Sequence, residues 1–142
     1  MTLRSVSPDN PQWSDLQSAL IVAGLPVDDL IQPGQHFFVA DNGAFGGIAV
    51  DGADALLRSI VVPETGRARG AGREIVEALA QEAARRGATD GWLLTTNAAE
   101  FFARCGFNIV RRETAPAFVR STRQFGGLCP DSAPLMHRAL IV

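Results

Sequence analysis

A glycine-rich turn between a strand and a helix constrains the fold of this 142-residue chain more than any other feature of its sequence. The apolar, β-branched run at residues 56–62 predicts a strand, and the turn Arg67-Ala68-Arg69-Gly70-Ala71-Gly72 follows it. Residues 71–86 carry one apolar stripe at helical spacing, and a second apolar strand is predicted at residues 91–96. Because a crossover helix joins parallel strands, these two strands should be parallel neighbours in one sheet.

The remaining segments predict an α/β (α+β) fold with one mixed sheet of six to seven strands, flanked by helices. Asn42-Gly43 and Asp51-Gly52 are turn signals, so the strands around them should form an antiparallel meander before the parallel junction. A helix should start at Asn97, with Glu100 completing a capping box. The other predicted strands are 3–6, 36–40, 45–50, 108–112 and 135–141; a helix is predicted within 8–24, and 114–134 is irregular or partly helical.

Composition narrows the classes of protein that the chain can represent. Its length fits one domain, residues 1–142, and its formal net charge of −2 argues against nucleic-acid binding, which favours a basic surface. The apolar runs are too short to cross a bilayer, and the first residues lack the apolar core of a signal peptide, so we expect a cytoplasmic protein without membrane contact. Cys105 and Cys129 lack zinc-type spacing, so no metal is expected.

The glycine-rich turn predicts a pyrophosphate site. The first N–H groups of a helix have no intrahelical acceptor, and the helix dipole favours negative charge there. Gly70 and Gly72 allow close approach of the backbone, while Arg67 and Arg69 add positive charge. The turn is not a Walker P-loop, because Arg73 follows Gly72, and it lacks the third glycine of a dinucleotide fingerprint.

Two motifs resemble those of the GCN5-related N-acetyltransferases (GNAT). Arg67-x-x-Gly70-x-Gly72 resembles their acetyl-CoA-binding motif, and Phe101-Phe102-Ala103-Arg104-Cys105-Gly106-Phe107 resembles their helix with an aromatic pair and a terminal Gly-Phe. A closer resemblance, to the second family of arsenic-resistance-associated N-acetyltransferases, rests on residues 57–62, Leu93-Leu94-Thr95-Thr96, Pro116, Ser121-Thr122, Gln124-Phe125, Cys129-Pro130-x-Ser132-Ala133 and Met136.

The resemblance implies transfer of an acetyl group from acetyl-CoA, as co-substrate, to a small amino-acid-like amine, including phosphinic or arsenic-containing amino acids. Backbone groups of strand 56–62 would meet the pantetheine arm and the thioester oxygen, and the turn would hold the pyrophosphate. Thr95 stands where many relatives have a CoA-contacting asparagine, a part that Asn97 could take instead. The implied cofactor-binding set is Ile60, Val61, Val62, Arg67, Ala68, Arg69, Gly70, Ala71, Gly72, Arg73, Thr95, Asn97 and Phe102.

The catalytic groups are harder to assign. Many relatives protonate the leaving thiolate with a tyrosine of the aromatic pair, but Phe102 stands there and the chain has no tyrosine. Cys105, one turn further on, is the substitute candidate, with Ser132 and Thr122 as weaker ones. Glu64, at the end of the strand, is the candidate general base.

The acceptor would meet polar residues of the strand and of the long loop. Arg58 lies inside an apolar strand, where a charge is costly to bury, so it should face the cleft and pair with a carboxylate or phosphinate. Ser59, Arg120 and Thr122 complete the predicted substrate-binding set, and Arg123 is a further candidate.

The general base has two alternatives to Glu64, His36 and Glu113.

Two other functions stay open. The missing tyrosine would suit a catalytically silent acyl-CoA-binding sensor domain. Cys105 and Cys129 would form an arsenic site if the fold brought their thiols together. Exposed sheet edges would also allow a homodimer, although no residue of the sequence specifies one.

Overall fold

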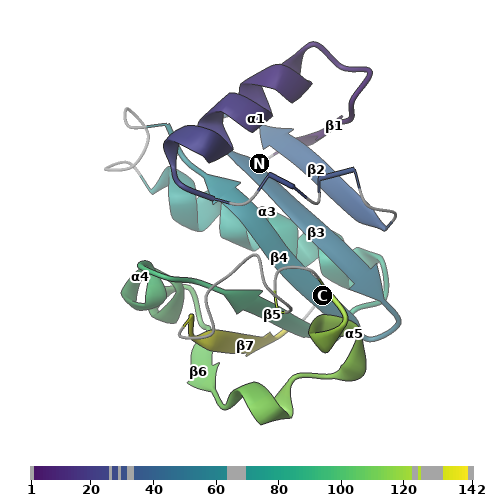
Figure 1. Cartoon of the computed structure of the whole chain (residues 1–142), viewed down its shortest axis with the longest axis vertical. Helices are drawn as coiled ribbons and strands as arrows, with labels where there is room; N and C mark the ends of the chain where they lie inside the picture. Colours follow the sequence, from purple (N-terminus) through teal and green to yellow (C-terminus); the bar gives the residue numbers. More distant parts are fainter. Residues whose placement is uncertain are drawn as a thin grey trace.

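A computed structural model describes residues 2–25, 27–28, 30–31, 34–63, 70–122, 125 and 133–140 of the chain. Its centre is a seven-stranded sheet in the order β1-β2-β3-β4-β5-β7-β6 (Figure 1). The strands are β1 Leu3–Val6, β2 Gln35–Ala40, β3 Phe45–Asp51, β4 Asp54–Val61, β5 Asp90–Leu94, β6 Asn108–Val110 and β7 Leu135–Ala139. The pair β4–β5 is parallel and the other neighbouring pairs are antiparallel, which confirms the predicted mixed sheet.

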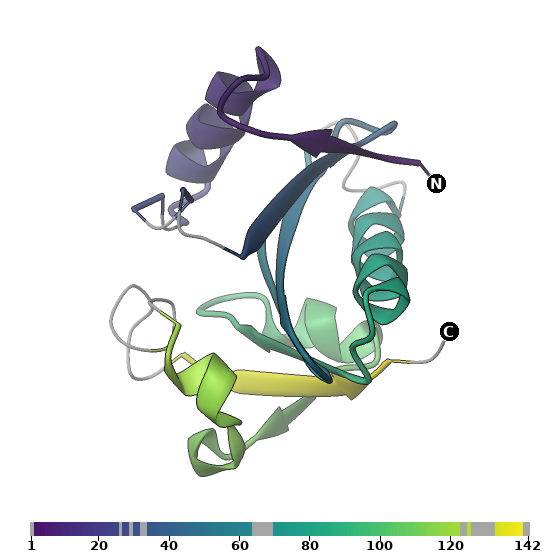
Figure 2. The same ribbon diagram turned by 90° about the vertical axis from the view of Figure 1, so that its right-hand side faces the viewer.

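Helices cover both faces of this sheet (Figure 2). They are α1 Gln12–Val22, α3 Ala71–Arg85, α4 Ala99–Arg104 and α5 Ala117–Arg120, with a 3₁₀ turn at Arg112–Thr114. In the views of Figures 1 and 2, α3 lies on one face, whereas α1 and α5 lie on the other. Among the helices in the described part of the chain, none has the length and hydropathy that a membrane crossing requires.

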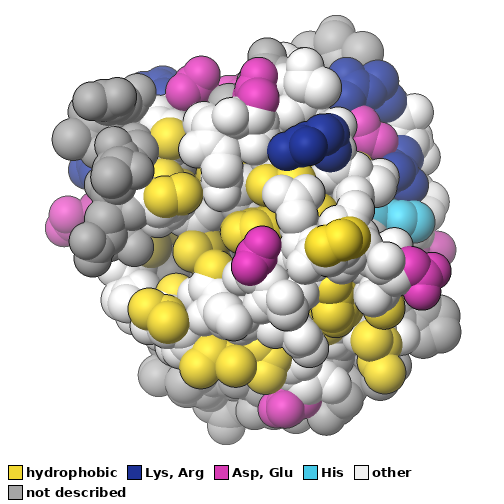
Figure 3. Space-filling model, turned by 90° about the horizontal axis from the view of Figure 1, so that it is seen from above, with side chains coloured by type: hydrophobic (Ala, Val, Ile, Leu, Met, Phe, Trp, Pro, Cys, Tyr) yellow, Lys and Arg dark blue, Asp and Glu magenta, His cyan; other side chains and the backbone are white. Residues whose placement is uncertain are grey.

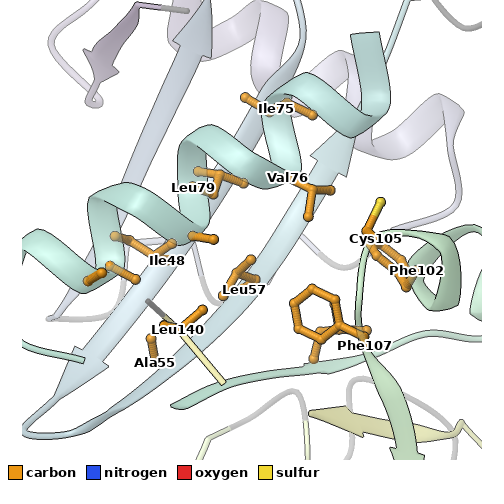
Figure 4. Packing of buried hydrophobic residues seen from close by; sticks show 14 of the residues in the cluster. Ile48, Ala55, Leu57, Ile75, Val76, Leu79, Phe102, Cys105, Phe107 and Leu140 are labelled. Carbon is orange, nitrogen blue, oxygen red and sulfur yellow. The ribbon is translucent and has the colours of Figure 1, made fainter. Parts of the chain in front are cut away.

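The largest hydrophobic cluster joins α3 and α4 to one face of the sheet (Figure 4). Ile75 and Leu79 of α3 are fully buried and pack in the same cluster as Ile48 of β3. Gly46 makes this close packing possible, because a Cβ atom there would lie 2.5 Å from Cδ1 of Leu79. On the other face, α1 and α5 cover two smaller, separate clusters.

The predicted hairpin between β2 and β3 is confirmed at Asn42-Gly43. Gly43 has a φ of +86°, which glycine adopts without strain, and Asn42 Oδ1 accepts a 2.9 Å hydrogen bond from the N–H of Ala44. The side-chain amide of Asn42 also donates to the carbonyl of Ala71, at 3.5 Å. The hairpin turn is thereby tied to the beginning of α3.

The predicted capping box of α4 is wrong. The cap position is Ala98, and the first helical residue is Ala99, two positions after Asn97. The hydroxyl of Thr95 instead accepts a hydrogen bond from the N–H of Ala98, at 3.1 Å. Thr95, directly after β5, thus binds the N–H of Ala98, while neither Asn97 nor another side chain caps α4 where it begins.

Candidate active site

A cleft of about 980 Å³ opens where β4 and β5 diverge. The two strands pair at three positions, from Asp54↔Asp90 to Leu56↔Trp92. Beyond Leu56, β4 runs on beside β3 alone, while β5 continues beside β7. Residues 57–62 line one side of the resulting gap, and residues 93–98 line the other. The parallel junction predicted from the sequence is therefore also what creates the site.

A β-bulge shapes the β4 side of the cleft. The register runs from Gly47↔Arg58 to Phe45↔Val61, so β4 contains one residue more than β3 across this interval. Ser59, within the bulge, has a φ of +58°, which is rare for a residue with a side chain. Ile60, within the bulge, and Val61 and Val62 beyond it also line the cleft.

One end of the cleft, the α3–α4 end, consists of Gly70, Gly72, Arg73, Phe101, Phe102, Arg104 and Cys105. Gly70 has a φ of +78°, and the first backbone hydrogen bond of α3 runs from the N–H of Glu74 to the carbonyl of Gly70. Three N–H groups before it, those of Ala71, Gly72 and Arg73, therefore have no acceptor within the helix. No side chain of the described residues caps α3. This helix start is suited to binding an anion.

Gly72 is required for packing as well. Its backbone is helical, and a Cβ atom at this position would lie 2.9 Å from Cζ of Phe101. Phe101 and Phe102 form an edge-to-face pair with ring centroids 5.1 Å apart, and Phe102 is buried in the cluster beneath α3. The glycine thus lets α3 and α4 approach each other where both line the cleft.

Thr95, Asn97 and Cys105 also line the cleft. Thr95 is buried and its hydroxyl is used by the start of α4, whereas Asn97 is exposed. Cys105 is buried in the hydrophobic cluster, beside Phe102 and Phe107 (Figure 4). Burial raises the pKa of the Cys105 thiol, which keeps it protonated at neutral pH.

The opposite end of the cleft, the α1 end, consists of Ala23, Gly24, Leu25, Asp28 and Arg58. Arg58 is 3% exposed, and its Nε donates to Oγ of Ser59 at 2.9 Å. Its guanidinium also lies over the ring of Phe37, 5.5 Å from the centroid. Seen from above, the molecule exposes hydrophobic side chains among acidic and basic ones (Figure 3), and Ile21 and Val22 of α1 are among the exposed hydrophobic residues.

Four predicted candidates lie away from the described cleft lining. The guanidinium of Arg120 donates to the backbone carbonyls of Glu113 and Ala115, and Thr122 donates to the carbonyl of Val119. Both residues therefore stabilise the chain around α5. Glu113 lies in the 3₁₀ turn that precedes α5. His36 lies on β2 near Arg86 and Glu82, and its burial, followed by the charge of Arg86, lowers its pKa.

Other candidates lie outside the described residues: Glu64, Arg67, Ala68, Arg69, Arg123, Cys129 and Ser132. Two charged residues of the described cleft lining had been assigned no role from the sequence, Asp28 and Arg104. Arg104 lies within the aromatic helix motif and one turn from Phe101, so that motif could have indicated it. Asp28 lies in a short loop with no local pattern to mark it. Nowhere in the described ranges do three His, Cys, Asp or Glu side chains gather as metal ligands would.

Comparisons with known proteins agree with this architecture. Residues 33–109, more than half of the chain, match the family model of the acetyltransferase (GNAT) domain. No curated protein sequence matches the chain significantly. N-acetylglutamate synthase from Neisseria gonorrhoeae, solved with coenzyme A and N-acetyl-glutamate, superposes with a TM-score of 0.75 at 17% identity, over 99% of this chain and 35% of the synthase. This chain thus spans about a third of the synthase.

Two further structures match over nearly their whole length. Rv2747 from Mycobacterium tuberculosis, solved in complex with CoA, has a TM-score of 0.75 at 18% identity, with 99% of this chain and 100% of that chain covered. An aminoglycoside 6′-N-acetyltransferase complexed with coenzyme A has a TM-score of 0.70 at 18% identity, with 100% and 98% covered. At these identities the superpositions establish a shared fold, and the family model establishes membership: this chain belongs to the GNAT acetyltransferase family.

Proposed function

We propose that this chain is an acetyl-CoA-dependent N-acetyltransferase that acts on a small amino-acid-like amine. The observation that carries the proposal is the cleft between β4 and β5, which has an anion-binding helix start at one end and a buried arginine at the other. The family uses acetyl-CoA as its acetyl donor. The two ends would let donor and acceptor meet at the β4 bulge, in the middle of the cleft.

The donor would bind along β4 and at the α3–α4 end. Backbone groups of Ile60, Val61 and Val62 would contact the pantetheine arm, and one of their N–H groups would point at the thioester oxygen. The N–H groups of Gly70, Ala71, Gly72 and Arg73 would hold the pyrophosphate, together with Arg67, Ala68 and Arg69. Thr95, Asn97 and Phe102 would line the arm from the side of β5 and α4. The volume of about 980 Å³ is ample for this arm and a small acceptor.

The reaction would form a C–N bond and break the C–S bond of the thioester. Glu64 would take a proton from the incoming ammonium, directly or through water, and the free amine would attack the thioester carbonyl. A backbone N–H directed at the developing oxyanion would lower the barrier by roughly 3 kcal/mol. As the C–S bond breaks, the nitrogen would lose its second proton to solvent, and the leaving thiolate would be protonated by solvent directly or by Cys105, whose raised pKa keeps the thiol protonated and which would regain its proton from solvent.

The acceptor would bind at the α1 end through Arg58, which Ser59 holds in place. A planar guanidinium suits a carboxylate, a phosphinate or an arsenic oxyanion, because each presents oxygens to its fork of donors. An arsenic- or phosphinic-containing amino acid is therefore the finer substrate proposal, with detoxification as its role. Arg120 and Thr122 are not included, because their side chains bond the backbone around α5.

Calorimetric titration with acetyl-CoA and desulfo-CoA, combined with a thiol-release screen over amino acids and phosphinothricin-like amines, tests the proposal. Binding together with turnover of an amine is the expected result. Binding without turnover of any amine would favour the alternative, an acyl-CoA-binding sensor, which the apolar Phe102 at the usual tyrosine position supports. Absence of binding would contradict the donor site itself.

A further inference from the structure

We propose that Asp28 and Arg58 together select a zwitterionic α-amino acid, with Asp28 binding its ammonium group and Arg58 its carboxylate. The inference rests on the proposed acetyltransferase function and adds a residue, Asp28, and a substrate class to it. Both side chains line the α1 end of the cleft.

Described residues before and after Asp28 in sequence pack against the sheet. Leu25 and Val27 pack against the hydrophobic cluster of α1 and β2, and Leu30 is buried in it. Val61 of β4 packs against the same cluster. Asp28 itself is exposed and lines the cleft. The described residues nearest to it in sequence, Val27 and Leu30, pack in this cluster, which brings Asp28 to the α1 end.

Arg58 reaches the same end from the sheet. Its guanidinium lies over Phe37, which belongs to the cluster that anchors the loop of Asp28. The Nε of Arg58 donates to Ser59, and Nη1 lies 3.5 Å from the side-chain oxygen of Gln35. These contacts orient the guanidinium before any substrate arrives, which reduces the entropy lost when it binds one. Asp28 and Arg58 therefore both line the α1 end of the cleft, next to residues of one hydrophobic cluster.

The distribution of charge favours a zwitterion over other amines. The charged side chains among the described lining residues are Asp28, Arg58, Arg73 and Arg104. Arg73 and Arg104 lie at the α3–α4 end, where the donor phosphates are expected. The described residues of the α1 end supply one group of each sign, which is the complement of an ammonium and a carboxylate. A polycationic amine such as an aminoglycoside would meet a single described carboxylate there.

Asp28 is assigned a binding role and not that of the general base. It would pair with the ammonium by a charge-assisted hydrogen bond and orient the nitrogen toward the β4 bulge. The proton that the nitrogen loses before attack would still leave through Glu64 or water. Removal of the Asp28 charge should therefore raise KM for the amine more than it lowers kcat.

The test compares three acceptors with the full chain: the L-amino acid that is turned over fastest in the thiol-release screen, its methyl ester and its decarboxylated amine. Asp28→Asn should lower kcat/KM by about ten- to a hundredfold for all three, because all three carry the ammonium group. Arg58→Gln should lower it by a similar factor for the amino acid, and by less than about twofold for the ester and the amine. Asp28→Glu should recover part of the loss.

Asp15→Asn is the matched control, because Asp15 is exposed on α1, carries the same charge and lies outside the described cleft lining. The affinity for acetyl-CoA should stay unchanged in every variant, which also shows that each one folds. If Asp28→Asn behaves like Asp15→Asn, or if the wild type acetylates the ester as well as the amino acid, the zwitterion inference is overturned while the acetyltransferase stands. If no amine is turned over although acetyl-CoA binds, the proposed acetyltransferase function itself is contradicted, and the zwitterion inference with it.

Discussion

The two ends of the cleft are built in different ways. The α3–α4 end combines two glycines and the N–H groups at the start of α3 with side chains of α4, and both helices pack on the largest hydrophobic cluster. The α1 end consists of side chains from a loop and from β4, above a smaller cluster that α1 forms with β2. Backbone donors remain when side chains change, whereas a loop can exchange its side chains freely. The first end therefore suits an invariant donor, and the second suits an acceptor particular to this chain.

The largest expected effect comes from damage to the α3–α4 end. Gly72→Glu would place a carboxylate in the first turn of α3 and drive a side chain into the ring of Phe101, 2.9 Å from a Cβ atom. We expect acetyl-CoA affinity, measured by calorimetry, to fall by more than about a hundredfold, because the anion site gains a like charge and loses close approach.

Gly72→Ala separates these two causes. It adds a Cβ atom without charge, and Phe101→Leu in the same chain removes the ring atom that this Cβ would meet. The single variant should lose about tenfold in affinity, roughly 1.4 kcal/mol, and the double variant should recover most of it. Normal binding of acetyl-CoA to Gly72→Glu would show that the helix start is not the donor site.

The same contrast explains which parts of the molecule could be predicted from sequence. The Asn42-Gly43 hairpin and the parallel pair β4–β5 follow from local backbone preferences and from chain connectivity, and the structure has them. Of the glycine-rich turn, the described residues show the positive φ of Gly70 and the start of α3. The start of α4 was misplaced because Asn97 met competition from Thr95, whose hydroxyl serves as the acceptor. Asp28 was missed because its place in the cleft depends on the packing of its neighbours in space.

The segment around α5 shows the opposite case, in which the sequence predicted a binding role and the structure gives the side chain local backbone partners. Arg120 has the charge of an anion-binding residue, yet its guanidinium donates to the carbonyls of Ala115 and Glu113. The sequence shows which hydrogen-bond donors a side chain carries, but it does not show whether nearby backbone carbonyls accept those hydrogen bonds in the fold. Insertion of β7 between β5 and β6 was likewise not predicted, since strand order at the end of a chain has no local signal.

A smaller effect is expected from Phe102→Tyr. This variant tests whether a tyrosine at this position would speed the reaction by protonating the leaving thiolate. Phe102 is buried beside Phe101 and lines the cleft, and the variant adds a phenol at the usual tyrosine position. We expect kcat of the thiol-release reaction to rise about three- to tenfold, less than general acids commonly contribute, because a CoA thiolate already leaves readily. Acetyl-CoA affinity should change by less than about twofold.

Phe101→Tyr is the matched control for that prediction, because it adds the same hydroxyl to the neighbouring, half-buried ring. An equal rise of kcat in both variants would mean that any hydroxyl in the pair improves solvation of the thiolate. A fall of kcat in Phe102→Tyr without change in Phe101→Tyr would mean that the buried phenol has no partner. In that case proton transfer from Cys105 or solvent would be sufficient.

The smallest effect concerns a polar pair at the base of the sheet, outside the described lining of either end of the cleft. His137 Nε2 lies 2.7 Å from Asp90 Oδ1, and this hydrogen bond is the main cause that lowers the pKa of Asp90. A lowered carboxyl pKa stabilises the fold above the unfolded value of about 3.9, and the contribution disappears as pH falls through the folded value. His137→Gln should therefore reduce the free energy of unfolding in urea by less than about 1 kcal/mol near pH 6, since Asp90 is partly exposed, and by almost nothing near pH 2.

A loss of stability that persists at pH 2 would mean that the variant instead disturbs the contact between the rings of His137 and Trp92, whose centroids lie 4.6 Å apart. Because this pair touches neither end, acetyl-CoA affinity and amine selectivity should not change, which would show that the contrast between the two ends belongs to the cleft and not to the stability of the sheet.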